Sequence, residues 1–150
     1  MQLQAAKPRF QAQGLKLAAI SYHRGVHVYS PSARGYKPIQ LALQPASGIE
    51  LSAATYPNSK VLYLEAIQGH VPVYQGKFCI TQDVTVTPSK TGDVVRALIS
   101  AEKTISITGE LKYQAGDQAI CYPPASVPLK WQLQILPLDL KRSPKAIQHR

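Results

Sequence analysis

Two long stretches in the second half of the chain alternate apolar and polar residues with a period of two. In the first stretch one parity holds Ile105, Ile107, Leu111, Tyr113 and Ala115. In the second stretch one parity holds Leu129, Trp131, Leu133 and Ile135. A period of two is typical of a strand with one buried face. We therefore predict two strands that pair antiparallel, with residues 116–127 as the excursion between them.

Shorter runs of the same kind occupy most of the remaining chain. They predict strands at 15–22, 26–29, 39–43, 49–55, 61–64 and 78–87, separated by turns rich in Pro and Gly. In the strand at 78–87 the alternation directs Ile80 and Val84 inward and Cys79 to the opposite face. Residues 65–72 are predicted to form a loop, and 93–100 is the one stretch with helical spacing.

Composition agrees with a loop-rich all-β protein. The chain has 150 residues with twelve Pro, nine Gly and eight Tyr, which is enough length for one domain with its own core. We expect an antiparallel β-sandwich or barrel of about seven or eight strands with at most one short helix. The expected organisation is a loose arm over 1–13, one domain over 14–138, and a basic tail or linker over 139–150.

Charge and cysteine content exclude several classes of protein. The net charge of +9 is scattered from Lys7 to Arg150, which does not favour nucleic-acid binding. No stretch is apolar and long enough to span a membrane. Two cysteines are too few for a disulfide scaffold and lack zinc-ligand spacing, so we expect no cofactor and no metal. The start lacks a signal-peptide pattern, so an exported protein would have lost its signal before this point.

The stretch 110–124 is the best candidate for chemistry. A strand breaks at Gly116-Asp117 and the chain returns to Cys121, which Tyr122-Pro123-Pro124 follow. Proline fixes φ and removes a backbone donor, so this loop is predicted to be rigid. Cys121 is therefore either a reactive thiol at a turn or a small buried apolar residue.

Several motifs resemble the amino-terminal domain of the thiol:disulfide interchange protein DsbD. The longest is Tyr113-Gln-Ala-Gly-Asp-Gln-Ala-Ile-Cys-Tyr-Pro-Pro124. The others are Gly25-Val-His-Val-Tyr29, Tyr36-Lys-Pro38, Tyr56-Pro57 and Val73-Tyr-Gln-Gly-Lys77. The resemblance covers about residues 14–136. It implies an immunoglobulin-like β-sandwich in the bacterial periplasm or cell envelope that exchanges thiols and disulfides with a thioredoxin-like or DsbD-type partner, and it leaves open a tether to a membrane domain.

The family motif places two cysteines at this loop, and this chain has only one of them. The second position corresponds to Cys121, whereas Gly116 occupies the first. Exchange needs one thiol to attack a disulfide and a second to resolve the mixed intermediate. Cys121 alone can start the reaction but cannot resolve it, unless Cys79 substitutes for the missing thiol.

The resemblance also suggests which side chains line the site. Tyr74 corresponds to the aromatic ring of a loop that shields the family's cysteines, so it is a candidate cover for Cys121, as is Tyr122. His27 and Tyr29 correspond to positions near residues that line the site, and a histidine near a thiol favours the thiolate. Each has a plainer interpretation: Tyr74 as an aromatic residue at a strand entrance, and His27 on an exposed strand face.

Three hypotheses about function follow. The first is a DsbD-like envelope domain with a degenerate cysteine pair, which acts as a docking module or as a single-thiol module. The second is an active exchange domain that combines Cys121 with Cys79 or with an external thiol. The third is an immunoglobulin-like binding domain with an inert cysteine. A glycine introduced deliberately at 116 to disable or trap the site is a further alternative.

Overall fold

The chain folds into three antiparallel sheets. The computed structural model describes residues 2–5, 9–11, 14–22, 25–45, 49–86 and 104–134. The first sheet has the order β1 (Gln2–Ala5), β3 (Gly14–Tyr22), β9 (Phe78–Val86) and β6 (Ile49–Leu51), with β2 (Arg9–Gln11) also paired to β3. The second sheet has the order β12 (Ala125–Gln134), β10 (Thr104–Tyr113) and β5 (Gln40–Leu43). The end sheet has the order β11 (Ala115–Gly116), β4 (His27–Tyr29), β8 (Gly69–Gln75) and β7 (Lys60–Leu64).

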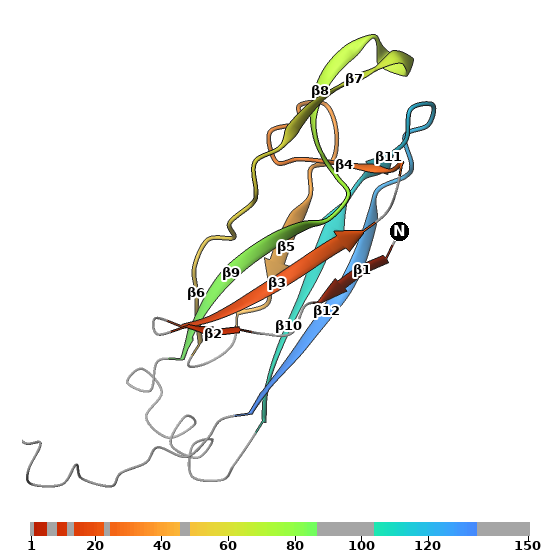
Figure 1. Ribbon diagram of the computed structural model, residues 1–150. Helices are drawn as coiled ribbons and strands as arrows, with labels where there is room; N and C mark the ends of the chain where they lie inside the picture. The colour runs from red at the N-terminus through yellow and green to blue at the C-terminus, as the bar shows by residue number, and fades with distance from the viewer. Residues whose placement is uncertain are drawn as a thin grey trace, which may run out of the picture.

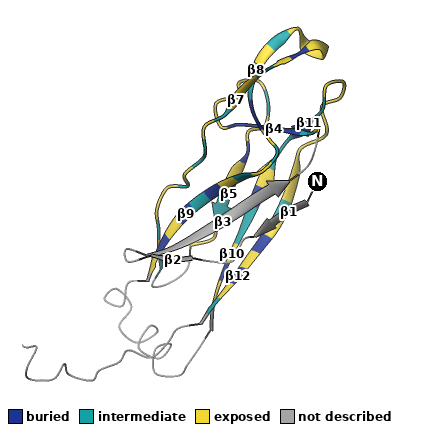
Figure 2. Ribbon diagram, viewed as in Figure 1, coloured by how far each residue is buried: buried dark blue, intermediate teal, exposed yellow. Residues whose placement is uncertain are grey.

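The first and second sheets pack face to face, and the end sheet lies at one end of this sandwich (Figure 1). The main core lies between the two faces. It contains Ile80 and Val84 from β9, together with Ile107, Leu111 and Trp131 from β10 and β12. All five are nearly inaccessible and appear as dark segments in Figure 2, where their strands are described. Burying each such side chain stabilises the fold by about 2–3 kcal/mol.

The end sheet has a second core of its own. Tyr29 lies at the centre of this cluster, with Val73, Val71, Leu64 and Ala33 around it. Its neighbour Val28 belongs to the main core instead, because successive side chains of a strand point to opposite faces. Strand β4 is therefore buried on both faces and has neighbouring strands on both edges, β11 and β8.

The predicted pairing of the two long strands is confirmed. Strands β10 and β12 run antiparallel, with Ile107 opposite Trp131 and Leu111 opposite Val127. The alternation in β9 is confirmed as well, since Ile80 and Val84 are buried whereas Cys79 is exposed. The expected all-β immunoglobulin-like sandwich is the observed fold. The described residues form twelve strands rather than seven or eight, because short pairings such as β11 add to the predicted set.

The structure differs from prediction at the amino terminus. Residues 2–5 and 9–11, expected within a loose arm, form β1 and β2 and pair with β3. An unpaired strand edge leaves backbone N–H and C=O groups without partners, so β3 offers these polar segments a reason to extend. The stretches 93–100 and 139–150 lie outside the described residues, and the domain boundaries at 14 and 138 stay predictions.

The predicted loop at 65–72 is shorter in the structure. A 3-10 turn, η1 (Glu65–Ile67), follows β7, and β8 begins at Gly69. Between them Gln68 has a left-handed backbone with φ of 47°, which closes a tight hairpin. The β7–β8 hairpin projects from the same end of the molecule as the loop between β11 and β12 (Figure 1).

Candidate functional site

The short strand β11 places Gly116 directly beside the buried strand β4. Ala115 pairs with Val28, and Gly116 pairs with His27. A single residue, Gln114, separates β11 from the long strand β10, so the sandwich carries the chain straight into the end sheet. Gln114 itself ties the surroundings together: its Oε1 accepts a hydrogen bond from the Lys37 N–H (3.0 Å), and its Nε2 donates to the Tyr122 carbonyl (3.1 Å).

Asp117 shapes the loop that follows. Its Oδ1 accepts hydrogen bonds from the backbone N–H groups of Ala119 and Ile120, each at 2.8 Å. Its Oδ2 accepts one from the Tyr122 hydroxyl at 2.8 Å. An Asp side chain that bonds the backbone two and three residues ahead stabilises a turn. The Ala119 N–H, followed by the Tyr122 hydroxyl, holds the pKa of Asp117 below its usual value, because these donors favour the charged carboxylate.

The loop closes where Cys121 returns to Gly116. These two residues form an isolated antiparallel bridge, the Asp117 N–H donates to the Ile120 carbonyl (2.9 Å), and the Tyr122 N–H donates to the Ala115 carbonyl (2.9 Å). Residues directly opposite in an antiparallel pair direct their side chains to the same side. The structure thus places residue 116 where a partner for the Cys121 sulfur would stand, and that residue has no side chain.

Tyr29 contacts the sulfur from below. Its hydroxyl lies 3.1 Å from Cys121 Sγ, its ring stacks on Tyr36 with centroids 4.1 Å apart, and the residue is fully buried. Burial, and next the hydrogen bond to Cys121, raise the pKa of Tyr29 well above its usual value. Tyr29 therefore keeps its proton at neutral pH, and its O–H can donate to a Cys121 thiolate.

His27 is buried rather than exposed on a strand face. Only 1% of it is accessible, and Nε2 has no hydrogen-bond partner among the described residues. Its ring meets Tyr29 edge-on, with centroids 5.3 Å apart. Burial lowers the pKa of His27, opposed by the nearby Asp117 carboxylate, so the imidazole is neutral at pH 7. The plainer interpretation of His27 is therefore wrong, because β11 covers the edge of β4.

The space beside Gly116 is crowded by polar atoms. A Cβ at this position would lie 3.0 Å from His27 Nε2, 3.0 Å from the Ile120 carbonyl oxygen and 3.3 Å from the Tyr29 hydroxyl. The neighbours of Gly116 have thus closed around the backbone to a distance that any side chain would have to push apart. Placing a cysteine here requires His27 and Tyr29 to move by a few tenths of an ångström.

Tyr74 does not cover Cys121. It pairs with Val28 in the β4–β8 ladder and shares the main core with it, so its ring lies on the face of the sheet opposite Tyr29. There it stacks on Phe78 with centroids 4.8 Å apart and donates a hydrogen bond to the Pro57 carbonyl (2.8 Å). The motif match was misleading because both faces of the end sheet are buried, and sequence alternation cannot tell them apart.

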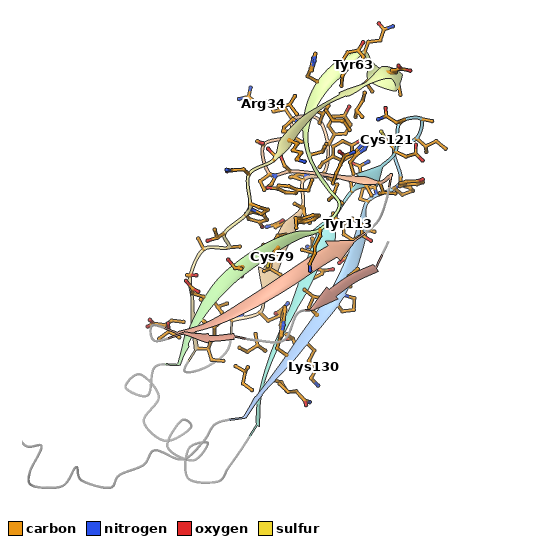
Figure 3. The ribbon with its side chains drawn as sticks, viewed as in Figure 1. Arg34, Tyr63, Cys79, Tyr113, Cys121 and Lys130 are labelled. Atoms are coloured by element: carbon orange, nitrogen blue, oxygen red, sulfur yellow. The ribbon has the colours of Figure 1, made fainter. Side chains whose placement is uncertain are left out.

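The two cysteines are both free and exposed. Cys79 lies in β9 on the sandwich, opposite Ile20 of β3, whereas Cys121 lies in the loop at the far end (Figure 3). Tyr122 does flank the site, through its hydrogen bond to Asp117. Sequence reasoning missed Asp117, Tyr36 and Gln114. For Asp117 a signal existed, since Asp after Gly at a strand end is typical of a side-chain-stabilised turn.

Within the described residues no helix is long and apolar enough to cross a bilayer. No match was found among curated proteins. Two solved structures are similar to the chain. The reduced DsbD N-terminal domain of Neisseria meningitidis has a TM-score of 0.51 at 13% identity, over 87% of this chain and 85% of that chain. The complex between the DsbD N-terminal and PilB N-terminal domains of the same organism has a TM-score of 0.49 at 14% identity, over 85% of this chain and 80% of that chain.

At such identities the likeness to the reduced domain concerns the fold, and the family is established independently. The family described as "Thiol:disulfide interchange protein DsbD, N-terminal" matches residues 1–128. This match includes all of the loop from Gly116 to Pro124 and both strands, β4 and β11, that position it. The chain therefore belongs to the family of N-terminal domains of the thiol:disulfide interchange protein DsbD.

Proposed function

We propose that this chain is a periplasmic DsbD-type domain that docks a thioredoxin-like partner and has a single exchange thiol, Cys121. The observation that supports this most is the pairing of Gly116 with Cys121. The position facing the sulfur is still built, at the end of a β-bridge, but it holds a glycine. Its surroundings have closed to 3.0 Å from where a Cβ would begin.

The chemistry open to this site is half of an exchange cycle. The Cys121 thiolate attacks one sulfur of a partner's disulfide, the partner's S–S bond breaks, and its other sulfur leaves as a thiolate. The Tyr29 hydroxyl, 3.1 Å from Sγ, stabilises the attacking thiolate by donating a hydrogen bond. Resolution then falls to the partner's own thiolate or to an external thiol, because residue 116 carries no sulfur and Cys79 lies elsewhere on the sandwich.

Docking is supported by the apolar surface at this end of the molecule. The large hydrophobic side chains that the described residues expose all lie in the β7–β8 hairpin with η1 or in the Cys121 loop: Val61, Tyr63, Ile67, Ile120 and Tyr122. Both segments project from the same end (Figure 1). Exposed apolar groups gathered around a reactive residue are typical of a protein-binding surface.

The test uses a thioredoxin-like domain in which one active-site cysteine is replaced and the other is activated as a mixed disulfide with thionitrobenzoate. Attack by Cys121 releases the coloured thiolate and leaves a covalent complex that intact mass spectrometry detects. We expect the complex with the wild-type chain and with Cys79→Ser at equal rates, and none with Cys121→Ser.

A complex that forms through Cys79, or an oxidised chain that loses two protons in mass, would overturn the single-thiol assignment in favour of a two-cysteine mechanism. No complex with any variant would favour a binding domain with an inert cysteine. Binding of the partner to Cys121→Ser, measured by calorimetry, reports docking without chemistry.

A further inference from the structure

The point beside Gly116 where a Cβ would stand is surrounded by three polar atoms, and we call it the oxygen seat. It lies 3.0 Å from His27 Nε2, 3.0 Å from the Ile120 carbonyl oxygen and 3.3 Å from the Tyr29 hydroxyl. These distances are short for carbon or sulfur, but they match hydrogen bonds to oxygen, which are about 2.7–3.2 Å long. The seat therefore selects an oxygen atom over a methyl group or a second sulfur.

The three groups also match a hydroxyl in their hydrogen-bonding character. A neutral imidazole can donate a proton from Nε2, and the Ile120 carbonyl accepts one. The tyrosine hydroxyl can do either. His27 is 1% accessible, and Nε2 has no partner among the described residues, which is costly for a buried polar atom. A hydroxyl in the seat would accept from His27 and donate to Ile120.

Cys121 is the residue beside the seat. It forms the β-bridge with Gly116, and Cβ atoms of directly opposed residues lie about 4.5–5.5 Å apart. Its Sγ is 3.1 Å from the Tyr29 hydroxyl, the same hydroxyl that borders the seat. An oxygen atom bonded to Sγ on the Gly116 side would thus point toward these polar atoms, whereas the outer side of the exposed thiol faces solvent (Figure 3).

We propose that Cys121 is a site of reversible oxidation to a sulfenic acid by a hydroperoxide, with the new S–O–H group held at the oxygen seat. The thiolate attacks one peroxide oxygen, an S–O bond forms and the O–O bond breaks. The sulfur is oxidised by two electrons, and the peroxide is reduced to hydroxide or alkoxide, which takes up a proton. The sulfenate takes up a second proton to become Cys121–S–O–H.

The missing sulfur at 116 is what makes this product long-lived. A sulfenic acid ordinarily condenses with a nearby thiol to give a disulfide. The residue that faces Cys121 is glycine, and the second cysteine of the chain is at the other end of the sandwich. This inference goes beyond docking and exchange, and it requires only that a small peroxide reach the exposed thiol.

The experiment compares sulfenic acid yields in a Cys79→Ser background. The chain is treated with hydrogen peroxide and then with a 1,3-diketone that forms an adduct with sulfenic acids alone, and the adduct at Cys121 is quantified by intact mass. Gly116→Ala fills the seat with a methyl group. His27→Phe removes its donor, and His27→Gln keeps an N–H donor. Gly69→Ala is the matched control, since a Cβ there meets its neighbours no closer than 3.6 Å.

We expect a Cys121 adduct in the background chain and in Gly69→Ala. Gly116→Ala and His27→Phe should lower its yield about threefold or more and raise the doubly oxygenated sulfinic acid in its place, whereas His27→Gln should restore most of the adduct. Circular dichroism establishes that each variant is folded. If Gly116→Ala fails to fold, the Phe and Gln variants of His27 decide the matter.

Equal adduct yields in His27→Phe and the background chain would overturn the oxygen seat, as would sulfinic acid without any adduct. Release of thionitrobenzoate, measured on the same samples, separates this proposal from the previous one. Exchange without a diketone adduct overturns only the seat, whereas a thiol that reacts with neither reagent overturns both.

Discussion

Tyr29 and Cys121 are 92 positions apart in the sequence, and the Tyr29 hydroxyl lies 3.1 Å from Cys121 Sγ. The hydroxyl is held there by burial of the ring and by its stack on Tyr36. Because the raised pKa of Tyr29 keeps the hydroxyl protonated, the contact favours the thiolate form of Cys121. The reactivity of this exposed thiol therefore depends on a strand that the loop itself does not contain.

Replacing Tyr29 by Phe should slow alkylation of Cys121. Loss of a hydrogen bond to a charged group costs about 1.5–3 kcal/mol, which would raise the thiol pKa and lower the rate with iodoacetamide at pH 7 by roughly tenfold. The measurement is the alkylation rate as a function of pH, in a Cys79→Ser background. Tyr63→Phe is the control, since that ring is 49% exposed and edges His70. Equal rates in Tyr29→Phe and the background chain would show that the hydroxyl does not assist the sulfur.

Replacing Asp117 by Ala should loosen the loop without unfolding the sandwich. The carboxylate accepts hydrogen bonds from the N–H groups of Ala119 and Ile120 and from the Tyr122 hydroxyl. Without them, hydrogen exchange at the 119 and 120 amides should accelerate about tenfold or more, while amides of β10 keep their protection. Nuclear magnetic resonance measures both in one sample.

The same loop should respond to acid in the wild-type chain. The folded pKa of Asp117 is lowered, so the stabilisation is present above the unfolded value and is lost as pH falls through the folded pKa. Acceleration at 119 and 120 should therefore appear only in strongly acidic solution. Acceleration already near pH 6 would contradict the contacts assigned to the carboxylate.

Burial of neutral His27 should make the fold less stable in mild acid. Its folded pKa is lowered below the ordinary value of 6.5, so the unfolded chain binds a proton first. The free energy of unfolding should be constant above that value and fall as pH decreases from about 6.5 toward the folded pKa. Urea unfolding between pH 7.5 and 5 tests this, and the fall should be smaller in His27→Gln. Identical pH profiles would mean that His27 is solvated in the native state.

Gly109→Ala should destabilise the second sheet. A Cβ there would lie 2.7 Å from Leu43 Cδ2 and 2.8 Å from the Ala42 carbonyl oxygen, and the second of these is a backbone atom of the paired strand β5. Overpacking of this kind costs about 1–3 kcal/mol. Thermal unfolding measures it, with Gly69→Ala as a substitution expected to change stability little. An unchanged melting temperature in Gly109→Ala would indicate that β5 shifts freely against β10.

Alternation predicted the parts of this fold that have one wet face and one dry face. Ile107 and Trp131 were assigned to the core, and Cys79 to the surface, because each strand carries polar residues at every second position. The same rule failed for β4 and β8, where adjacent residues such as Val73 and Tyr74 are both buried. A strand enclosed on both faces has no wet side for the pattern to mark.

The candidate site was predicted in part. The motif around Cys121 indicated the loop and the empty partner position at Gly116. It could not indicate that His27 closes on that glycine, because this contact depends on the pairing of β11 with β4. Nor could it separate Tyr74 from the site, since only the β4–β8 register shows that Tyr74 shares a face with Val28.

Because only Gln114 separates β10 from β11, the alignment of Gly116 with Cys121 is inherited from the ladder of β10 on β12. A one-residue slip in a strand turns every following side chain to the other face. A single insertion or deletion anywhere between 104 and 116 would therefore misdirect the site, even though each of its side chains remained. The length of β10, as much as any side chain, is a constraint on what this loop can become.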